Sequence, residues 1–242
     1  MSTITSLIPL NDAANNFLAR KNHRLIIGGQ HVDALSGERI ETRDPSTGQV
    51  IGTLAAGNEH DVARAVDAAR KAFTGEWARW TPFERQAFLN KAHDAIDKHF
   101  EELAQIEAVD MGAPISRVRA TKASGLKMIL YFAAQSTAIA GETMQNGLPG
   151  QVMTMSLRAP VGVVGGIIPW NGPLNAQWWV LGGALATGCT LVLKPAEDAS
   201  LSVIRVVELL HEIGLPPGVI NVVTGYGHTA GAALASHPGV DR

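Results

Sequence analysis

The chain has 242 residues, of which 46% are hydrophobic and 17% charged, and its net charge is −2. This composition is that of an ordinary globular protein and gives no reason to expect nucleic acid or a membrane surface as a partner. One cysteine excludes an intramolecular disulfide framework and fits a reducing compartment, so we expect a cytoplasmic protein. The longest apolar run is too short to span a bilayer, so no membrane segment is expected.

The amino-terminal part is predicted to be a loose extension followed by short strands. Residues 1–24 lack the basic segment and apolar core of a secretory signal, and we interpret them as an extension. Residues 25–57 are typical of short strands joined by tight turns, with "DPSTGQ" forming a turn centred on Ser46 to Gly48.

Helical signals follow from residue 58 onward. Asn58 can cap one helix, and "TPFE", which begins at Thr81, offers a cap, a proline in the first turn and a capping-box glutamate for a second. We expect a third helix to end at Gly112 and a fourth to run from about Pro114 to Ala140. The second helix has the apolar face Phe88, Leu89, Ala92, Ile96 and Phe100.

Strands and helices alternate after residue 160, following the half-exposed strand pattern of "QVMTMSLR" at 151–158. The predicted order is strand 161–168, helix 173–187, strand 190–194, helix 199–213, strand 219–223 and helix 228–236. This alternation predicts an α/β fold with a parallel sheet covered by helices on both faces. The series stops at "HPGVDR" with no closing strand, so we expect a sheet that is incomplete at its C-terminal end.

The first candidate site follows the strand in "GGIIPWNGPL". Pro169 ends the strand and Pro173 suits the first turn of the next helix, which places Asn171 in a strand-to-helix turn. Open α/β sheets present groups to ligands at such turns, but an Asn before Gly-Pro is also a common helix N-cap. Both interpretations stay open at this point.

The second and third candidates follow the next two strands. In "TLVLKPAEDAS" a buried strand ends at Lys194, and Glu197 lies three residues on, so a donor and an acceptor could bind ribose hydroxyls. Alternatively, Lys194 is solvated and Glu197 complements a helix dipole. In "TGYGHTAG" the glycines could let backbone N–H groups approach a phosphate-bearing ligand, although the spacing is one residue longer than the dinucleotide fingerprint. A plain glycine-rich turn is the alternative.

All three candidates lie at the carboxyl ends of successive predicted strands, which is one edge of one sheet. Here "GIIPWNGPL", "ALATGCTLVLKPAE", "GLPPGVINVVTGYG" and "AGAALASHPGVD" resemble the cofactor-binding half of the aldehyde dehydrogenase superfamily. The resemblance extends back through "DPSTGQVI" and covers nearly everything after residue 24.

The resemblance implies a Rossmann-like cofactor domain at 25–142 and 161–242, with oligomerisation strands at 143–160. It implies NAD as the cofactor, with NADP as the alternative, and no metal. Asn171 would donate its amide to the carbonyl oxygen of a thiohemiacetal. The implied cofactor-binding residues are Ile167, Ile168, Pro169, Trp170, Lys194, Ala196, Glu197, Gly227, Gly231 and Ala232.

The resemblance also implies what this chain lacks. The nucleophilic cysteine and general-base glutamate of the family belong to later motifs, beyond Arg242, so we expect the chain alone to be inactive. Cys189 precedes a buried strand without an electropositive setting and is rejected as a substitute. The complete protein would oxidise an aldehyde to a carboxylic acid through a thioester, as a homodimer or homotetramer. The alternatives are a natural short form that binds nucleotide without catalysis, and an interaction role in which strand 151–158 pairs with another chain.

Overall fold

The structure is a computed structural model, and it describes residues 7–242. The short strands predicted for 25–57 are present, but a loose extension is wrong for the described part of 1–24, because Phe17 and Leu18 of a helix are buried in the core. Residues 1–6 of that prediction lie outside the described residues. The elements are α1 (Asp12–Leu18), β1 (Asn22–His23), β2 (Leu25–Ile27), β3 (Gln30–Val32), β4 (Arg39–Arg43) and β5 (Val50–Ala55).

The helical region begins where its caps predict. Asn58 and Thr81 both form capping boxes, whereas the second and third predicted helices are one helix that continues until Gly112 adopts φ +76°. No glycine or proline interrupts that stretch, so nothing local ends the helix earlier. The fourth helix is divided at Thr121, whose hydroxyl donates to the Val118 carbonyl and competes with the helical pattern. The elements are α2 (Glu59–Thr74), η1 (Trp77–Arg79), α3 (Pro82–Met111), α4 (Ile115–Ala120) and α5 (Lys122–Ala138).

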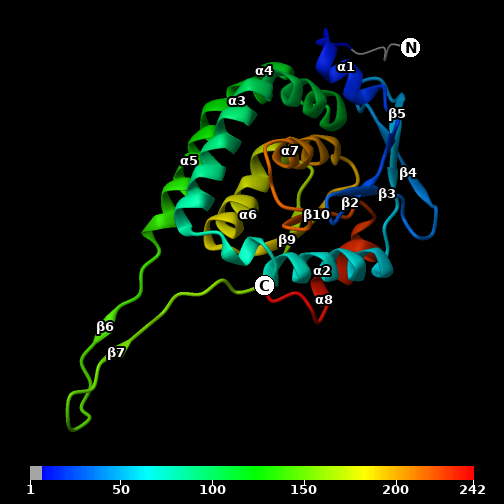
Figure 1. Cartoon of the computed structure of the whole chain (residues 1–242). Helices are drawn as coiled ribbons and strands as arrows, with labels where there is room; N and C mark the ends of the chain where they lie inside the picture. The colour runs from blue at the N-terminus through cyan, green and yellow to red at the C-terminus, as the bar shows by residue number, and fades with distance from the viewer. Residues whose placement is uncertain (1–6) are drawn as a thin grey trace.

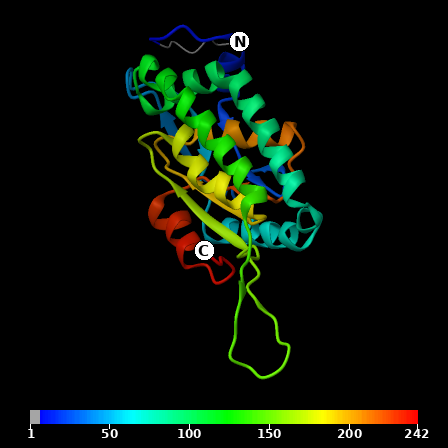
Figure 2. The same cartoon turned by 90° about the vertical axis from the view of Figure 1, so that its left-hand side faces the viewer.

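A two-stranded hairpin leaves the body of the molecule between α5 and the α/β series. Its strands, β6 (Thr143–Met144) and β7 (Thr154–Met155), pair antiparallel and are much shorter than the predicted 143–160. Figure 2 shows the hairpin extending away from the packed helices. The alternating pattern at 151–158 therefore indicated extended chain correctly but overestimated the paired length.

The alternating series forms the main sheet as predicted, with one addition. The strand order is β3-β2-β10-β9-β8, in which β8, β9 and β10 are parallel and the β2–β3 hairpin joins antiparallel. At the other edge, Asp241 N–H donates to the Val163 carbonyl and Gly165 N–H donates to that of Arg242. The elements are β8 (Val163–Ile168), α6 (Pro173–Thr187), β9 (Thr190–Pro195), α7 (Leu201–Glu212), β10 (Ile220–Val222), η2 (Gly227–Gly231) and α8 (Ala232–Ser236).

Helices cover both faces of this sheet, as predicted. Leu191 and Leu193 of β9 pack toward α6 and α7, whereas Val192 packs with α2 and α8 on the opposite face. This alternation is the two-residue period of a strand buried on both faces. Figure 1 shows α2 and α8 on the side of the sheet away from α6 and α7.

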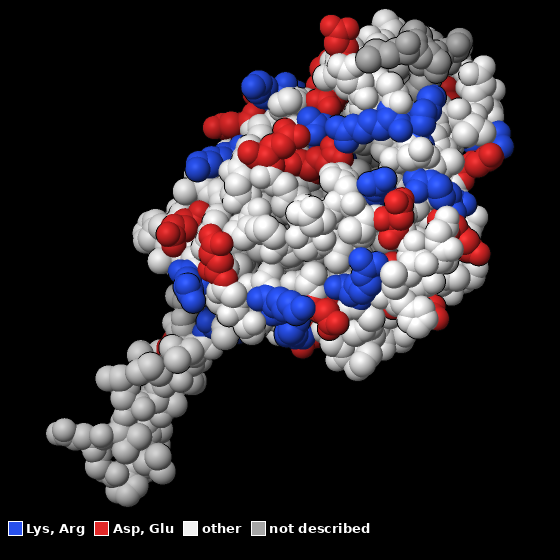
Figure 3. All heavy atoms as spheres, turned by 45° about the vertical axis from the view of Figure 1, so that its right-hand side comes forward, with Lys and Arg blue, Asp and Glu red and all other residues white. Residues whose placement is uncertain are grey.

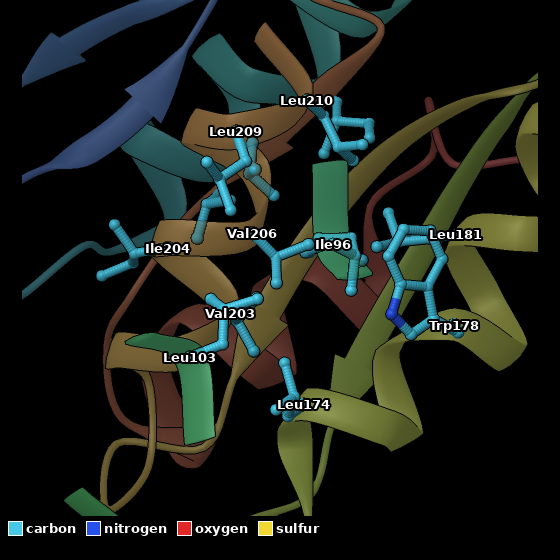
Figure 4. Close-up of a cluster of buried hydrophobic side chains, with 14 of the residues drawn as sticks. Ile96, Leu103, Leu174, Trp178, Leu181, Val203, Ile204, Val206, Leu209 and Leu210 are labelled. Carbon is cyan, nitrogen blue, oxygen red and sulfur yellow. The ribbon is translucent and has the colours of Figure 1, made fainter. Parts of the chain in front are cut away.

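The long helix α3 forms a further layer over α6 and α7. Figure 4 shows Ile96 and Leu103 of α3 among side chains from the other two helices, including Leu174, Trp178 and Val203. All of these residues are buried. Because α3 contacts the first turns of both α6 and α7, it can fix where those helices begin.

The surface gives two further observations. On the face in Figure 3, basic and acidic side chains are interspersed, with no extended field of one sign among the described residues. Across residues 7–242, no helix is long and apolar enough to cross a membrane.

Candidate functional site

The turns after β8, β9 and β10 meet at one edge of the sheet. Ala196 N–H, after β9, donates to the Ile168 carbonyl of β8 at 2.9 Å. Gly227 N–H, after β10, donates to Oε1 of Glu197 at 3.3 Å. These two hydrogen bonds join the three turns in which the sequence placed its candidate residues, so the three candidates form one continuous edge.

Asn171 lies in the turn after β8 with its side chain exposed. The N-cap of α6 is Gly172, at φ +151°, and no side chain caps that helix from this position. Among the described residues, the Asn171 amide has no hydrogen-bond partner. The helix-cap interpretation of Asn171 is therefore wrong, and its amide is left available to a ligand.

The residues at and just after the end of β8 differ in exposure. Ile167 and Trp170 are 56% and 60% exposed, and Pro169 is also exposed. Ile168 is buried in the core, so it reaches the edge only through its carbonyl. Three apolar side chains are thus exposed at and just after the end of β8.

Lys194 and Glu197 form an ion pair at the end of β9. Lys194 Nζ donates to Glu197 Oε2 at 2.5 Å, and the lysine is only 2% exposed, so it is not a solvated side chain. Partial burial opposes ionisation of Glu197, but hydrogen bonds from Lys194, from its own backbone and from Gly227 outweigh this effect and lower its pKa. Since α7 begins only at Leu201, Glu197 lies before the helix and not in its first turn.

The glycines after β10 have two different roles. A Cβ on Gly225 would stand 2.5 Å from the Gly57 carbonyl, and its φ is +152°, so this glycine is required by the fold itself. No atom lies within 4 Å of a Cβ on Gly227, and one on Gly231 would meet nothing closer than 3.9 Å. The backbone is therefore open to close approach at exposed Gly227, whereas Gly231 is buried against the Lys194 side chain, and Ala232 beyond it is exposed.

Sequence reasoning missed two buried carboxylates on α3. Glu107 Oε2 accepts from the Leu174 N–H of α6 at 2.7 Å, and Asp110 Oδ2 accepts from the Leu201 N–H of α7 at 2.8 Å. Burial raises the pKa of each to about 7, against hydrogen bonds that lower it. A signal was present, because the end of α3 has apolar residues on every side: Leu103, Ala104, Ile106, Ala108 and Val109.

Cys189 has no access to this edge. It is 3% exposed, packs in the core and accepts a hydrogen bond from Thr187 Oγ1 at 3.3 Å. A nucleophilic thiol needs partial exposure, which Cys189 lacks, so this cysteine is a packing residue. Within residues 7–242, no three His, Cys, Asp or Glu side chains are placed to hold a metal ion.

The mixed sheet, its two helical layers and its clustered turns define a Rossmann-like α/β domain. Residues 31–242 match the family model described as the aldehyde dehydrogenase family. This chain belongs to the aldehyde dehydrogenase family.

Relatives and solved structures agree with this family. The chain is 44% identical to a mitochondrial benzaldehyde dehydrogenase of Antirrhinum majus, over 90% of the chain and 41% of that protein. It is 41% identical to the NADP/NAD-dependent aldehyde dehydrogenase PuuC of Escherichia coli, over 90% of the chain and 44% of that protein. The NAD+ complex of a Bacillus cereus aldehyde dehydrogenase superposes with a TM-score of 0.92 at 40% identity, covering 98% of this chain and 48% of that one. The chain thus spans less than half the length of these relatives.

Proposed function

We propose that the complete protein containing this chain oxidises an aldehyde to a carboxylic acid with NAD, and that this chain supplies the cofactor site and one oxyanion donor. The observation that carries the proposal is the joining of the three turns by Ala196 N–H and Gly227 N–H. These bonds place an unpartnered amide, an ion pair and an open glycine backbone on one edge. An α/β sheet binds nucleotides at this edge.

The residues present fit an adenosine ribose. Glu197 accepts hydrogen bonds from ribose hydroxyls, and Lys194 donates from behind it. The open space over Gly227 admits the cofactor close to the backbone, and Gly231 lets Lys194 pack against the chain beneath it. Ile167, Pro169 and Trp170 supply apolar surface for the rest of the cofactor, with Ala196 and Ala232 at the margins. When bound, NAD supplies the hydride acceptor of the reaction.

Asn171 acts on the aldehyde oxygen in this proposal. Its exposed amide has no competing partner among the described residues, so its N–H can donate to the oxygen as negative charge develops there. An amide neither gains nor loses a proton near neutral pH, and it therefore donates in the same way over a wide pH range. The attacking thiol and the general base come from outside this chain, since Cys189 is buried in the core.

The hairpin of β6 and β7 is proposed as the assembly surface, giving a homodimer or homotetramer. Its strands and flanking residues expose Met144, Leu148, Val152, Met153, Met155 and Leu157. So many exposed apolar side chains on one narrow projection are typical of a surface that is covered by another copy. We further propose a cytoplasmic setting, because the single cysteine forms no disulfide.

Turnover of the complete protein tests the proposed reaction. We expect NADH absorbance to appear only when an aldehyde and NAD are both present. Asn171→Ala should bind NAD normally and turn over far more slowly. A complete, folded protein that binds NAD but oxidises none of a broad aldehyde panel would instead support nucleotide binding without catalysis.

A further inference from the structure

Helix α6 begins without a cap of its own. Its N-cap residue, Gly172, has no side chain, and its first residue, Pro173, has no N–H, so the first N–H that needs an acceptor belongs to Leu174. That N–H is buried with its residue and donates to Glu107 Oε2 at 2.7 Å. A carboxylate from another helix therefore does the work that an N-cap side chain usually does.

The same oxygen also holds the first turn of α7. Ser202 Oγ donates to Glu107 Oε2 at 2.8 Å, so one atom of α3 joins the beginnings of α6 and α7. Glu107 is 4% exposed, and the apolar side chains around it include Leu103 and Leu174, which Figure 4 shows close to the α6–α7 contact. A buried, doubly hydrogen-bonded carboxylate has little freedom to move, and its partners share that restriction.

This junction lies directly behind the candidate site. Asn171 comes three residues before Leu174, and Glu197 comes five residues before Ser202. No hydrogen bond within the described residues fixes the Asn171 side chain, so its position depends on the backbone of the turn, which leads into the first turn of α6 that Glu107 anchors. Resting on the proposed function, we infer that Glu107 is a positioning residue, which holds the Asn171 amide in place by tethering the first turn of α6 to that of α7.

Two variants of Glu107 in the complete protein test this role, with Glu102→Gln as a matched control. Glu102 is also a buried carboxylate on α3, but its partner on the α6–α7 layer is Arg205 of α7, and within residues 7–242 it forms no hydrogen bond with α6. Glu107→Ala removes the acceptor, whereas Glu107→Gln keeps an oxygen acceptor without the charge. Three quantities are measured: hydrogen exchange of the Leu174 amide without any substrate, kcat per cofactor-binding site, and the dissociation constant for NAD.

We expect Glu107→Ala to speed exchange at Leu174 by tenfold or more and to lower kcat by roughly tenfold, because small displacements of a reacting group are costly. At a pH above 7, where the Glu107 carboxyl is ionised, Glu107→Gln should fall between wild type and Ala in exchange and in kcat, because a neutral hydrogen bond is about half as strong. NAD affinity should stay within about twofold throughout. Glu102→Gln should leave exchange and kcat near wild type. Since Gln preserves the side-chain volume, it keeps the test informative where the Ala variant does not fold.

Three results would overturn the inference in a protein that is active with aldehyde. They are unchanged Leu174 exchange, faster exchange with unchanged kcat, and a loss of cofactor-binding sites in proportion to activity, which would indicate a general structural role. If the wild-type protein oxidises no aldehyde, the proposed function itself fails and this inference fails with it. The two failures are distinguished by the wild-type turnover alone.

Discussion

Lys194 Nζ lies 2.5 Å from Glu197 Oε2, and the two side chains differ in exposure, at 3% and 27%. The carboxylate therefore stands at the surface of the edge, with the ammonium group behind it. A ribose that reaches this edge meets the acceptor before the donor. The order of the two charges favours a free 2′-hydroxyl over a 2′-phosphate, because the phosphate and the carboxylate repel each other.

Glu197→Ser should therefore change cofactor preference. We expect NAD affinity to fall by about tenfold through loss of charge-assisted hydrogen bonds, and the disadvantage of NADP to shrink or reverse as Lys194 becomes free. Equilibrium titration of both cofactors measures the ratio. Asp198→Ser is the control, since Asp198 is exposed and does not bond Lys194. An equal loss for NAD and NADP would show that Glu197 does not discriminate at the ribose.

Asn171→Ala should lower kcat by roughly 10²- to 10³-fold, the usual effect of losing one oxyanion donor. Asn171→Asp has the same shape but no N–H, and should lose at least as much activity at neutral pH. NAD affinity should stay close to wild type in the Ala variant, because the amide faces the aldehyde. Steady-state rates combined with NAD titration separate the two effects, and near-normal turnover in either variant would remove Asn171 from the chemistry.

Assembly should depend on the apolar hairpin. Met153→Lys places a charge next to β7 on the proposed assembly surface and should shift the complete protein toward smaller species in sedimentation velocity. Thr154→Pro, which removes a backbone N–H from β7, should act in the same direction. Phe83→Lys is the matched control, since Phe83 and Met153 are both 74% exposed and Phe83 lies on α3. Unchanged assembly in both hairpin variants would place the interface elsewhere.

Stability should fall as pH rises toward neutrality. Burial raises the pKa of Glu107 from 4.5, and that of Asp110 from 3.8, to about 7, against hydrogen bonds from Ser202, Leu174, Leu201 and Thr42. The folded state thus holds protons that the unfolded state has lost. The stabilisation that these protons provide is complete below the unfolded-state pKa values of the two groups, and it is lost as pH rises to about 7. Each group contributes a slope of at most about 1.4 kcal/mol per pH unit.

Glu107→Gln isolates one of these two contributions. Its urea midpoint should depend less on pH between 5 and 7.5 than that of wild type, leaving the part due to Asp110. The nearby charges of Arg117 and Asp198 are unchanged in this comparison. An identical pH dependence in the two proteins would mean that Glu107 does not titrate in this range.

Local signals predicted much of the fold. Helix α6 spans the predicted residues 173–187, because Pro173 starts it and Gly188, at φ +82°, ends it. Asn58 and Thr81 likewise mark their helices through hydrogen bonds made within four residues. By contrast, α1 is stable through Phe17 packing in a distant core, and the β2–β3 hairpin joins the main sheet through the contact of Ile26 with Val222. Neither contact produces a recognisable pattern in the local sequence.

The sequence likewise predicted which residues share the candidate site, but not how their side chains pair. The carboxyl ends of parallel strands must share an edge, so the order of strands was enough to bring Asn171, Lys194 and Gly227 together. The ion pair of Lys194 and the tether made by Glu107 depend on side-chain directions and on partners up to 95 residues apart. The apolar residues on every side of the end of α3 indicate that Glu107 is buried, but they do not show which N–H or hydroxyl groups it accepts from.

A structure of the complete protein with bound NAD tests the central claim most directly. The adenosine ribose should lie within hydrogen-bond distance of both Lys194 Nζ and the Glu197 carboxylate, with the cofactor passing over the backbone of Gly227. The Asn171 amide should face the reacting end of the cofactor without touching it. Density for NAD at another surface, with no contact between the cofactor and the Lys194–Glu197 pair, would contradict the account.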